Sequence, residues 1–248
     1  MKYLIYLSYL GSGFVGFQVQ KGSDARTVQG ELCRAARELF GTECKVTGCS
    51  RTDSGVHALE YAATLEVVSD TVIPLERLPR AFGAKLDGDI VVHSAAVVPD
   101  GYSVRRHVAE KEYEYLILNS PTPSPFYAGR AWHIPLKLDE KKMNIAAENI
   151  VGRHDFSSFM ASGSSVKDTV RTVSMCRVSR DGDLVKINIR ADGFLYNMVR
   201  IIVGTLVDVG EEKTDAGNVA RIIGACDRSL AGRTAPPDGL YLKKVILN

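Results

Sequence analysis

The spacing of hydrophobic and polar residues along the first part of the chain predicts alternating strands and helices. Residues 2–10 form an aromatic and β-branched run, which is typical of a β-strand. A later apolar face at helical spacing predicts a helix that Thr27 caps at its start and Gly41 ends. Two further strands are expected at 43–49 and 59–69, joined by a short polar loop.

The remaining elements complete this order and then repeat it. Pro74 is expected to open a helix that runs to about Lys85, and residues 89–98 return as a strand, so the first half reads β-α-β-β-α-β. The second half is an elaborated version of the same order, although no residue-level repeat joins the two halves. Its expected strands are 111–119, 169–180, 183–191 and 239–247, and its expected helices are 138–152, 194–210 and 214–226.

Strands with helices segregated to one side predict an α+β fold. We expect two ferredoxin-like (RNP-like) domains whose antiparallel sheets flank a central cleft. The turn PDGYS predicts a boundary near residue 104, and hence domains of residues 1–104 and 105–248. With 248 residues, 45% of them hydrophobic, the chain can bury either one large core or two smaller ones.

Cysteine usage and charge exclude several classes of protein. The five cysteines are odd in number and contain no C-x-x-C pair, which argues against a disulfide framework or a structural zinc site. The five histidines lack metal-ligand spacing, so no metal is expected. A formal net charge of +2 is too small to indicate nucleic-acid binding by itself. An RNA partner must therefore be inferred from local features.

The run at 2–10 also bears on the cellular location. It lacks the cleavage site of a signal peptide, and no apolar run approaches the roughly 20 residues that cross a bilayer. Together with the reduced thiols, this predicts a soluble, cytoplasmic protein that does not enter a membrane.

The stretch CSRTDSGVHAL, residues 49–59, places Arg51 and Asp53 in the polar loop between two expected strands. An Asp two residues before a Gly often only stabilises a turn. Alternatively, a carboxylate with a pKa of about 3.9, kept ionised by a nearby Arg, is a standing nucleophile or base that needs no activating His. His57 follows in the sequence, but no nucleophile elbow accompanies it. Spacing alone leaves both interpretations open.

The same loop resembles the catalytic loop of the tRNA pseudouridine synthase A (TruA-type) family, whose pattern reads GRTDxGVHA. The chain departs from this pattern at Ser50, where Gly is usual, at Leu10, where Asp is common, and at Tyr61, where Gln is common. These changes concern RNA contacts rather than the chemistry. Further blocks that resemble family motifs follow in the expected order: GSGFVGFQVQ, TVQGEL, KEYEYLILN, GRHDFSSF, FLYNMVRIIVGTLVDVG and AGRTAPPDGLYL.

The resemblance implies an isomerase that acts in tRNA modification and converts uridine to pseudouridine without a cofactor or metal. Such an enzyme breaks the bond between ribose C1′ and N1 of uracil and forms a bond from C1′ to C5. The match assigns the catalytic role to Asp53. Whether this residue attacks the sugar or the base, or whether the reaction passes through a glycal, stays open. Each route needs a pocket that holds the detached base and excludes water.

The resemblance also implies roles for four residues that bind the substrate. Tyr113 is matched to a tyrosine that stacks on the flipped uracil, although an isolated Tyr is more often a strand aromatic. Arg51 is matched to an arginine that fills the space left by the base or contacts the RNA backbone. Arg200 lies within an apolar helix, where a buried Arg needs an acidic partner, and the match makes that partner Asp53; a solvent-facing Arg is the alternative. Leu240 is matched to a residue lining the uracil pocket, or is ordinary strand core.

Binding of tRNA is expected to depend on basic residues in or beside loops and helix ends, although each one alone is more often a solvated surface charge. Together they would contact phosphates, so binding would weaken steeply with salt. The resemblance implies a homodimer that modifies positions 38 to 40 in the anticodon stem-loop. The candidate RNA-binding residues are Arg77, Arg80, Arg105, Arg106, Lys111, Arg153, Lys167 and Arg171.

Two other functions compete with this one. The first is a catalytically inactive RNA-binding module built on ferredoxin-like domains, but the chain lacks the K/R-G-F/Y-G/A-F-V-x-F/Y signature of such modules and a module would not need the RTD loop. The second is a pseudouridine synthase with a different RNA target, such as ribosomal RNA.

Overall fold

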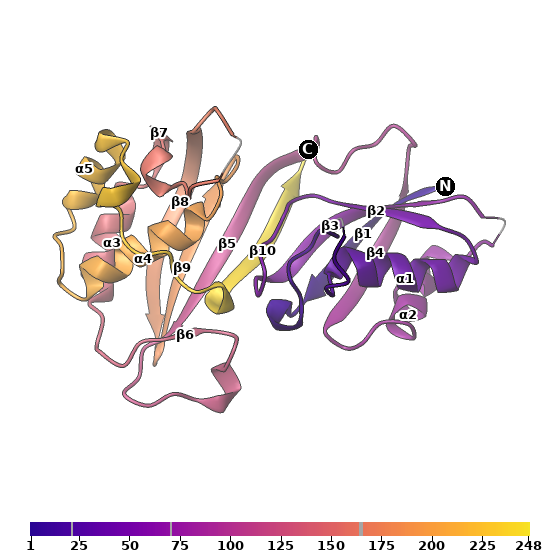
Figure 1. Cartoon of the computed structure of the whole chain (residues 1–248), viewed down its shortest axis with the longest axis horizontal. Coiled ribbons are helices and arrows are strands. Elements are labelled where there is room, and N and C mark those ends of the chain that lie inside the picture. The colour runs from indigo at the N-terminus through magenta and orange to yellow at the C-terminus, as the bar shows by residue number, and fades with distance from the viewer. Residues whose placement is uncertain (21, 70, 164–165) are drawn as a thin grey trace. The chain divides into compact units, whose positions relative to one another are not determined.

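The chain forms two compact units. The computed structural model describes residues 1–20, 22–69, 71–163 and 166–248. One unit consists of Met1–Ala109 and Tyr241–Asn248, and the other consists of Glu110–Leu240 (Figure 1). Each unit combines helices with a mostly antiparallel sheet, which confirms the predicted α+β class.

The sheet of the first unit is built around β1 (Lys2–Tyr9) and β3 (His57–Val67), which pair antiparallel. On its other edge β1 pairs with β4 (Ile90–Val98), and β3 pairs with β2 (Cys44–Gly48), so the strand order is β4-β1-β3-β2. These strands match those expected from the alternating pattern, apart from shifts of a few residues at their ends.

The last strand, β10 (Leu240–Leu247), runs parallel to the start of β3, with Tyr241 opposite His57. The C-terminal residues therefore cluster with the first unit, whereas the sequence-based limits keep them in the second half, 105–248. Parallel pairing joins strands that are far apart in sequence, and no local signal announces it. Whether the predicted limits describe separately folding domains stays a prediction.

The α-helices found in the described part of the first unit are α1 (Val28–Phe40) and α2 (Leu78–Gly83). As predicted, Thr27 caps α1: its side-chain oxygen accepts a hydrogen bond from Gly30 N at 3.1 Å. Gly41 ends the helix in the left-handed conformation, with φ of 68°. The helix expected after Pro74 begins with a 3-10 turn before α2. Helix α1 packs beside β2, and α2 packs beside β4.

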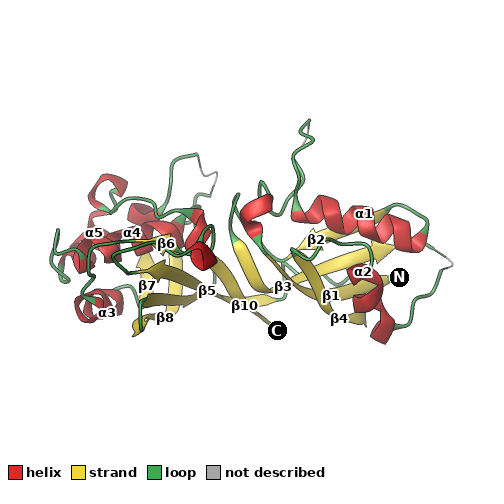
Figure 2. Ribbon diagram, turned by 90° about the horizontal axis from the view of Figure 1, so that it is seen from below, coloured by secondary structure: helices red, strands yellow, loops and turns green. Residues whose placement is uncertain are grey.

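The sheet of the second unit has the order β5-β9-β8-β7. Figure 2 shows the strands in yellow and the helices in red. The pairs along this order are antiparallel. The two-residue strand β6 (Trp132–His133) adds to β5 in parallel and was not expected from the sequence. The other strands are β5 (Val108–Leu118), β9 (Leu184–Ala191), β8 (Val170–Asp181) and β7 (Gly152–Asp155).

The helices of the second unit are α3 (Glu140–Glu148), α4 (Met198–Gly210) and α5 (Asn218–Ala225). Helix α4 is buried over most of its length, as its apolar sequence predicts. It begins later than expected because Asn197 takes the left-handed conformation, with φ of 59°. Among the described residues, no helix is long and apolar enough to span a bilayer.

Candidate active site

The loop that carries Asp53 connects β2 to β3. Arg51 is exposed, Thr52 is buried, and Asp53 is half-buried. The loop contains a tight turn in which Val56 N donates to the main-chain oxygen of Asp53 at 3.2 Å, and Gly55 has φ of 80°. The turn is therefore closed by the backbone of Asp53.

The glycine-rich segment that follows β1, residues 11–20, packs against this loop. Phe17 N donates to Thr52 O at 3.2 Å, and Gly55 N donates to Phe14 O at 3.3 Å. Gly16 has φ of 110°, and a Cβ there would lie 2.6 Å from Thr52 O, so only glycine fits. The segment after β1 therefore fixes the backbone of the Asp53 loop through these hydrogen bonds.

His57, the first residue of β3, binds the same glycine-rich segment. Gly11 N donates to His57 Nδ1 at 2.9 Å, so this nitrogen acts as an acceptor. A Cβ on Gly11 would overlap Val56 O. The buried His57 ring stacks on Tyr241, with ring centroids 4.6 Å apart. These contacts hold the His57 ring between the glycine-rich segment and β10.

Tyr61 contacts the loop from β3. Its hydroxyl accepts a hydrogen bond from Ser50 N at 3.4 Å and donates one to Ser50 O. Its buried ring stacks on Phe17, with centroids 4.5 Å apart. A Cβ on Gly48 would overlap the Tyr61 hydroxyl, so the close approach requires glycine. Ser50 and Tyr61, two of the departures from the family pattern, are therefore direct partners.

Two further contacts within the first unit hold the loop and the end of β2 in place. The hydroxyls of Tyr9 and Thr52 lie 2.8 Å apart and share a hydrogen bond. At the end of β2, the main-chain oxygen of Gly48 accepts a hydrogen bond from Arg105 Nε at 2.9 Å. The sequence did not predict that these residues contact the Asp53 loop. The glycine-rich block and the His of GVHA do, however, lie within the motifs that resemble the family.

The other predicted substrate-binding residues belong to the second unit. Tyr113 is 7% exposed on β5, and its ring meets Phe194 edge-on with centroids 5.0 Å apart. Leu240 is 5% exposed at the start of β10. The assembly of these residues around a uracil stays a prediction.

Arg200 is half-buried on α4. Its Nε donates to Ala235 O at 2.7 Å, and its Nη1 donates to Asn197 Oδ1 at 2.9 Å. The first contact holds the segment after α5, which Tyr115 also holds through a 2.7 Å hydrogen bond to Pro236 O. Burial raises the pKa of the Tyr115 hydroxyl, so it stays protonated as a donor. The pairing of Arg200 with Asp53 stays a prediction.

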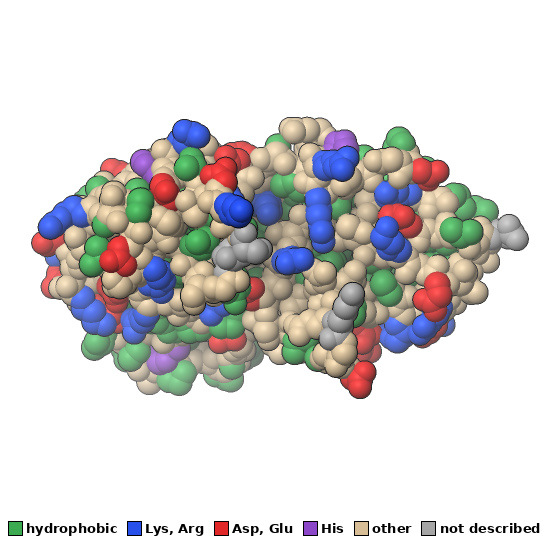
Figure 3. Space-filling view, turned by 45° about the horizontal axis from the view of Figure 1, so that its top comes forward, with side chains coloured by type: hydrophobic (Ala, Val, Ile, Leu, Met, Phe, Trp, Pro, Cys, Tyr) green, Lys and Arg blue, Asp and Glu red, His purple; other side chains and the backbone are tan. Residues whose placement is uncertain are grey.

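Most of the basic residues predicted to bind RNA are exposed. Arg171 is half-buried, and its Nη1 donates to Asp168 O at 3.0 Å and to Val170 O at 2.6 Å. Figure 3 shows Lys and Arg side chains on one face, with acidic side chains among them. Lys111 is half-buried, and the exposed members are Arg77, Arg80, Arg105, Arg106, Arg153 and Lys167.

Across the residues with described positions, no cluster of His, Cys, Asp and Glu side chains is suited to holding a metal ion. The five cysteines are free. Burial raises the pKa of the Cys176 thiol to about 12, so this residue is a buried, unreactive thiol.

Known proteins with similar sequences are consistent in their function. A family model described as tRNA pseudouridine synthase matches residues 5–105 and 146–248. A protein named tRNA pseudouridine synthase A from a Thermoanaerobacter species is 44% identical over 98% of each chain. Proteins of the same name from Acetivibrio thermocellus and Bacillus licheniformis are 43% and 44% identical over 97% of this chain and 97% and 96% of theirs.

A solved structure titled "Crystal Structure of a Cbf5-Nop10-Gar1 Complex" is matched with a TM-score of 0.38 and 13% identity, over 96% of this chain and 50% of that one. This likeness is too weak to bear on the fold or the site. The near full-length identity to the curated relatives and the family match confirm the resemblance seen in the motifs. The chain belongs to the tRNA pseudouridine synthase family.

Proposed function

We propose that this protein isomerises uridine to pseudouridine in tRNA, with Asp53 as the catalytic carboxylate. The main support in the structure is the fixed conformation of the Asp53 loop. The glycine-rich segment holds it through Phe14 and Phe17, and β3 holds it through Tyr61. A carboxylate on such a loop is positioned before the substrate arrives, which lowers the entropy cost of the reaction.

The chemistry requires one bond to break and another to form. The bond from ribose C1′ to N1 of uracil breaks, a bond from C1′ to C5 forms, the proton on C5 leaves, and N1 gains a proton. An ionised Asp53 either attacks C1′ or the base as a nucleophile, or removes a ribose proton to give a glycal. Each route begins from the carboxylate form, which predominates at neutral pH for an ordinary Asp with a pKa of about 3.9.

The substrate is proposed to be the anticodon arm, with modification at positions 38 to 40. Arg51 is exposed beside Asp53, so its guanidinium is free to fill the space that the flipped base leaves or to contact a phosphate. Tyr113 is proposed to stack on the uracil, Leu240 to line its pocket, and Arg200 to pair with Asp53. These three assignments rest on the matched motifs KEYEY, DGLYL and LYNMVR.

The RNA backbone is proposed to bind the basic residues on both units. Exposed Arg77 directly precedes α2, exposed Arg80 lies within α2, and exposed Arg153 lies on β7. The phosphate contacts release counterions, so the logarithm of the association constant should fall linearly with the logarithm of the salt concentration. We further propose that two copies form a homodimer in the cytoplasm.

We also propose that the chain contains two ferredoxin-like domains. The support comes from the first unit, in which a β-α-β-β-α-β order gives the sheet order β4-β1-β3-β2 with α1 and α2 as the connecting helices.

The test measures tritium release from a tRNA transcript labelled at uracil C5. Wild-type protein should release label, and Asp53→Asn should release none while binding tRNA with unchanged affinity. Asp24→Asn is the matched control, because Asp24 is an exposed loop carboxylate in the same unit, and this variant should keep wild-type activity. Reverse-transcription mapping of the product should place the modification at positions 38 to 40.

Two results would contradict the proposal. Release of label by Asp53→Asn at the wild-type rate would remove the catalytic role of Asp53. Tight binding of tRNA without release by the wild type would favour the inactive RNA-binding module, or an enzyme for another RNA if label is released from ribosomal RNA instead.

A further inference from the structure

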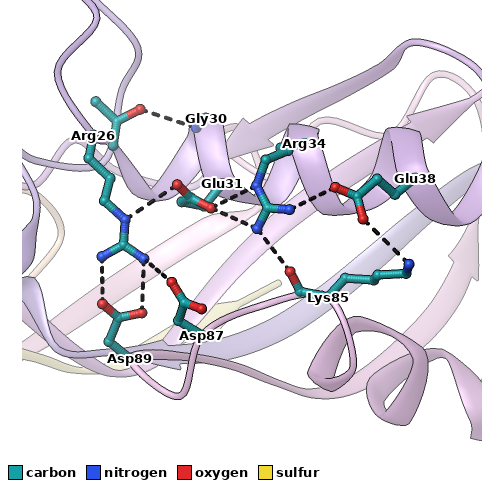
Figure 4. A network of polar contacts seen from close by, with 9 residues as sticks. Arg26, Gly30, Glu31, Arg34, Glu38, Lys85, Asp87 and Asp89 are labelled. Carbon is teal, nitrogen blue, oxygen red and sulfur yellow. Dashed lines mark hydrogen bonds and ion pairs between the residues drawn. The ribbon is translucent and has the colours of Figure 1, made fainter.

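Arg26 lies just before α1 and binds three carboxylates at once (Figure 4). Its Nη1 donates to Asp89 at 2.7 Å, its Nη2 donates to Asp87 at 3.0 Å, and its Nε donates to Glu31 at 3.3 Å. The three acids come from α1 and from the turn before β4. The planar guanidinium is therefore fixed from three directions, which a lysine ammonium on a flexible chain would not achieve.

The same guanidinium contacts the glycine-rich segment. It lies over the Phe14 ring, with Cζ 4.4 Å from the ring centroid. The main-chain oxygen of Arg26 accepts a hydrogen bond from Val15 N at 3.0 Å, and that of Asp89 accepts one from Leu10 N at 2.9 Å. The ion pair between Arg26 and Asp89 thus joins the two residues that hold both ends of segment 10–15.

Phe14 connects this segment to the Asp53 loop. Its ring is held by Arg26, and its main-chain oxygen accepts hydrogen bonds from Ser54 Oγ and Gly55 N, both at 3.3 Å. Ser54 and Gly55 directly follow Asp53 in the sequence. A continuous series of contacts therefore runs from Arg26 through Phe14 to the peptide that carries the proposed catalytic carboxylate.

We propose that Arg26 is a positioning residue for Asp53, an inference that rests on the proposed function. The ion pairs of Arg26 are partly exposed, with 34% of its side chain accessible, so their contribution to global stability is small. Displacing a catalytic group by as little as about 1 Å can lower a rate by about 100-fold. Loss of Arg26 should therefore affect turnover far more than stability.

Arg34 provides a matched control within the same network. It binds Glu31 at 3.0 Å, Glu38 at 2.8 Å and the main-chain oxygen of Lys85 at 2.8 Å, and, like Arg26, it is half-buried (Figure 4). It shares Glu31 with Arg26, but its hydrogen bonds do not reach the glycine-rich segment. If the network has a purely structural role, removing either arginine should lower kcat and Tm to a similar extent.

The experiment compares Arg26→Gln and Arg34→Gln, each alone and combined with Ser54→Ala. It measures multiple-turnover tritium release with saturating tRNA, which gives kcat, together with tRNA affinity by filter binding and Tm. Arg26→Gln should lower kcat by about 10- to 100-fold with little change in affinity, whereas Arg34→Gln should leave kcat within about 2-fold at a similar loss in Tm. Arg26→Gln and Ser54→Ala should be non-additive in kcat, because they disrupt one series of contacts, and Arg34→Gln and Ser54→Ala should be additive.

The results that overturn the inference are distinct from failure of the proposed function. Equal losses of kcat in the two arginine variants, or full additivity of Arg26→Gln with Ser54→Ala, would show that Arg26 does not position Asp53. A rise in the dissociation constant at unchanged kcat would make Arg26 an RNA contact instead. Absence of label release by the wild type would refute the proposed function itself.

Discussion

The hydroxyl of Tyr61 forms hydrogen bonds with both main-chain polar groups of Ser50. Ser50 lies in the loop that carries Asp53, and Tyr61 lies in the buried part of β3, where its ring stacks on Phe17. One side chain therefore fixes the orientation of the peptide that leads into RTD. The sequence departs from the family pattern at both positions, and the contact shows that the two departures form one local arrangement.

Replacing Tyr61 by Phe should test this arrangement. The ring keeps its packing, but Ser50 N–H and C=O lose two hydrogen bonds, each worth roughly 0.5–1.5 kcal/mol. We expect the free energy of unfolding to fall by about 1–3 kcal/mol, measured by urea denaturation. Turnover should also fall, because the peptide before Asp53 loses a fixed orientation.

Tyr3→Phe is the control for Tyr61→Phe. Tyr3 is also a buried tyrosine of this sheet, but its hydroxyl donates to Met1 Sδ, at 3.5 Å, and not to the Asp53 loop. Its loss should leave turnover unchanged. Equal turnover in Tyr61→Phe and wild type would mean that the Ser50 contact does not orient the loop.

Gly48→Ala should disturb the same contact between Tyr61 and the Asp53 loop. An added methyl group would overlap the Tyr61 hydroxyl and lie 2.5 Å from the Phe17 ring, and both rings are packed too tightly to move freely. We expect a loss of stability of about 1–3 kcal/mol, together with reduced tritium release.

Gly83→Ala provides the comparison for the methyl group itself. Gly83 lies at the end of α2, and a Cβ there meets nothing within 4 Å. This change should raise stability by up to about 1 kcal/mol, because alanine favours the helix. Similar Tm values for the two alanine variants would contradict the packing argument at Gly48.

The elements that the sequence predicted well are those fixed by local chemistry. Thr27 begins α1 and Gly41 ends it, as expected, because a capping side chain and a left-handed glycine each depend only on residues nearby in the sequence. Asn197 delays the start of α4 by a left-handed conformation that its apolar neighbours do not reveal. The pairing of β10 with β3 joins opposite ends of the chain, which periodicity cannot detect.

In the candidate site, too, the features fixed by local sequence could be predicted, and those that depend on distant segments could not. The position of Asp53 followed from a motif, and the motif lies in the loop between two strands as expected. The residues that hold this loop, such as Phe14, Arg26 and Tyr61, come from separate segments, and only the folded chain brings them together. The glycine-rich block was a signal available in the sequence, because glycines at Gly11 and Gly16 indicate a close backbone approach.

Asp208, on α4, should make stability depend on pH. Burial raises the pKa of its carboxyl, and this outweighs the attraction of Arg233 and Lys213. A carboxyl with a raised pKa lowers stability above its folded pKa and costs nothing below its unfolded pKa of about 3.9. Asp208→Asn should therefore raise Tm at pH 7, and this gain should vanish as the pH falls below about 4.

Asp155 is the matched case, because the pKa of its carboxyl is shifted in the opposite direction, downward. The hydrogen bond from the Thr169 side chain lowers its pKa, with a further contribution from Ser157 N at 2.9 Å. Its stabilisation is present above the unfolded pKa and is lost as the pH falls through the lowered folded pKa. Asp155→Asn should lower Tm at pH 7 but not in strong acid. A parallel pH response of the two Asn variants would contradict both assignments.

Arg51→Lys tests whether the exposed side chain beside Asp53 acts through its shape or only through its charge. A lysine keeps the positive charge but cannot stack as a planar group or donate in a fork. If Arg51 fills the space left by the flipped base, this variant should slow single-turnover label release at nearly unchanged tRNA affinity. Its salt dependence should match that of the wild type, because the number of phosphate contacts is preserved. Wild-type rates in Arg51→Lys would instead assign the residue to the RNA backbone, where Arg51→Gln should then lower affinity and reduce the salt slope by about one.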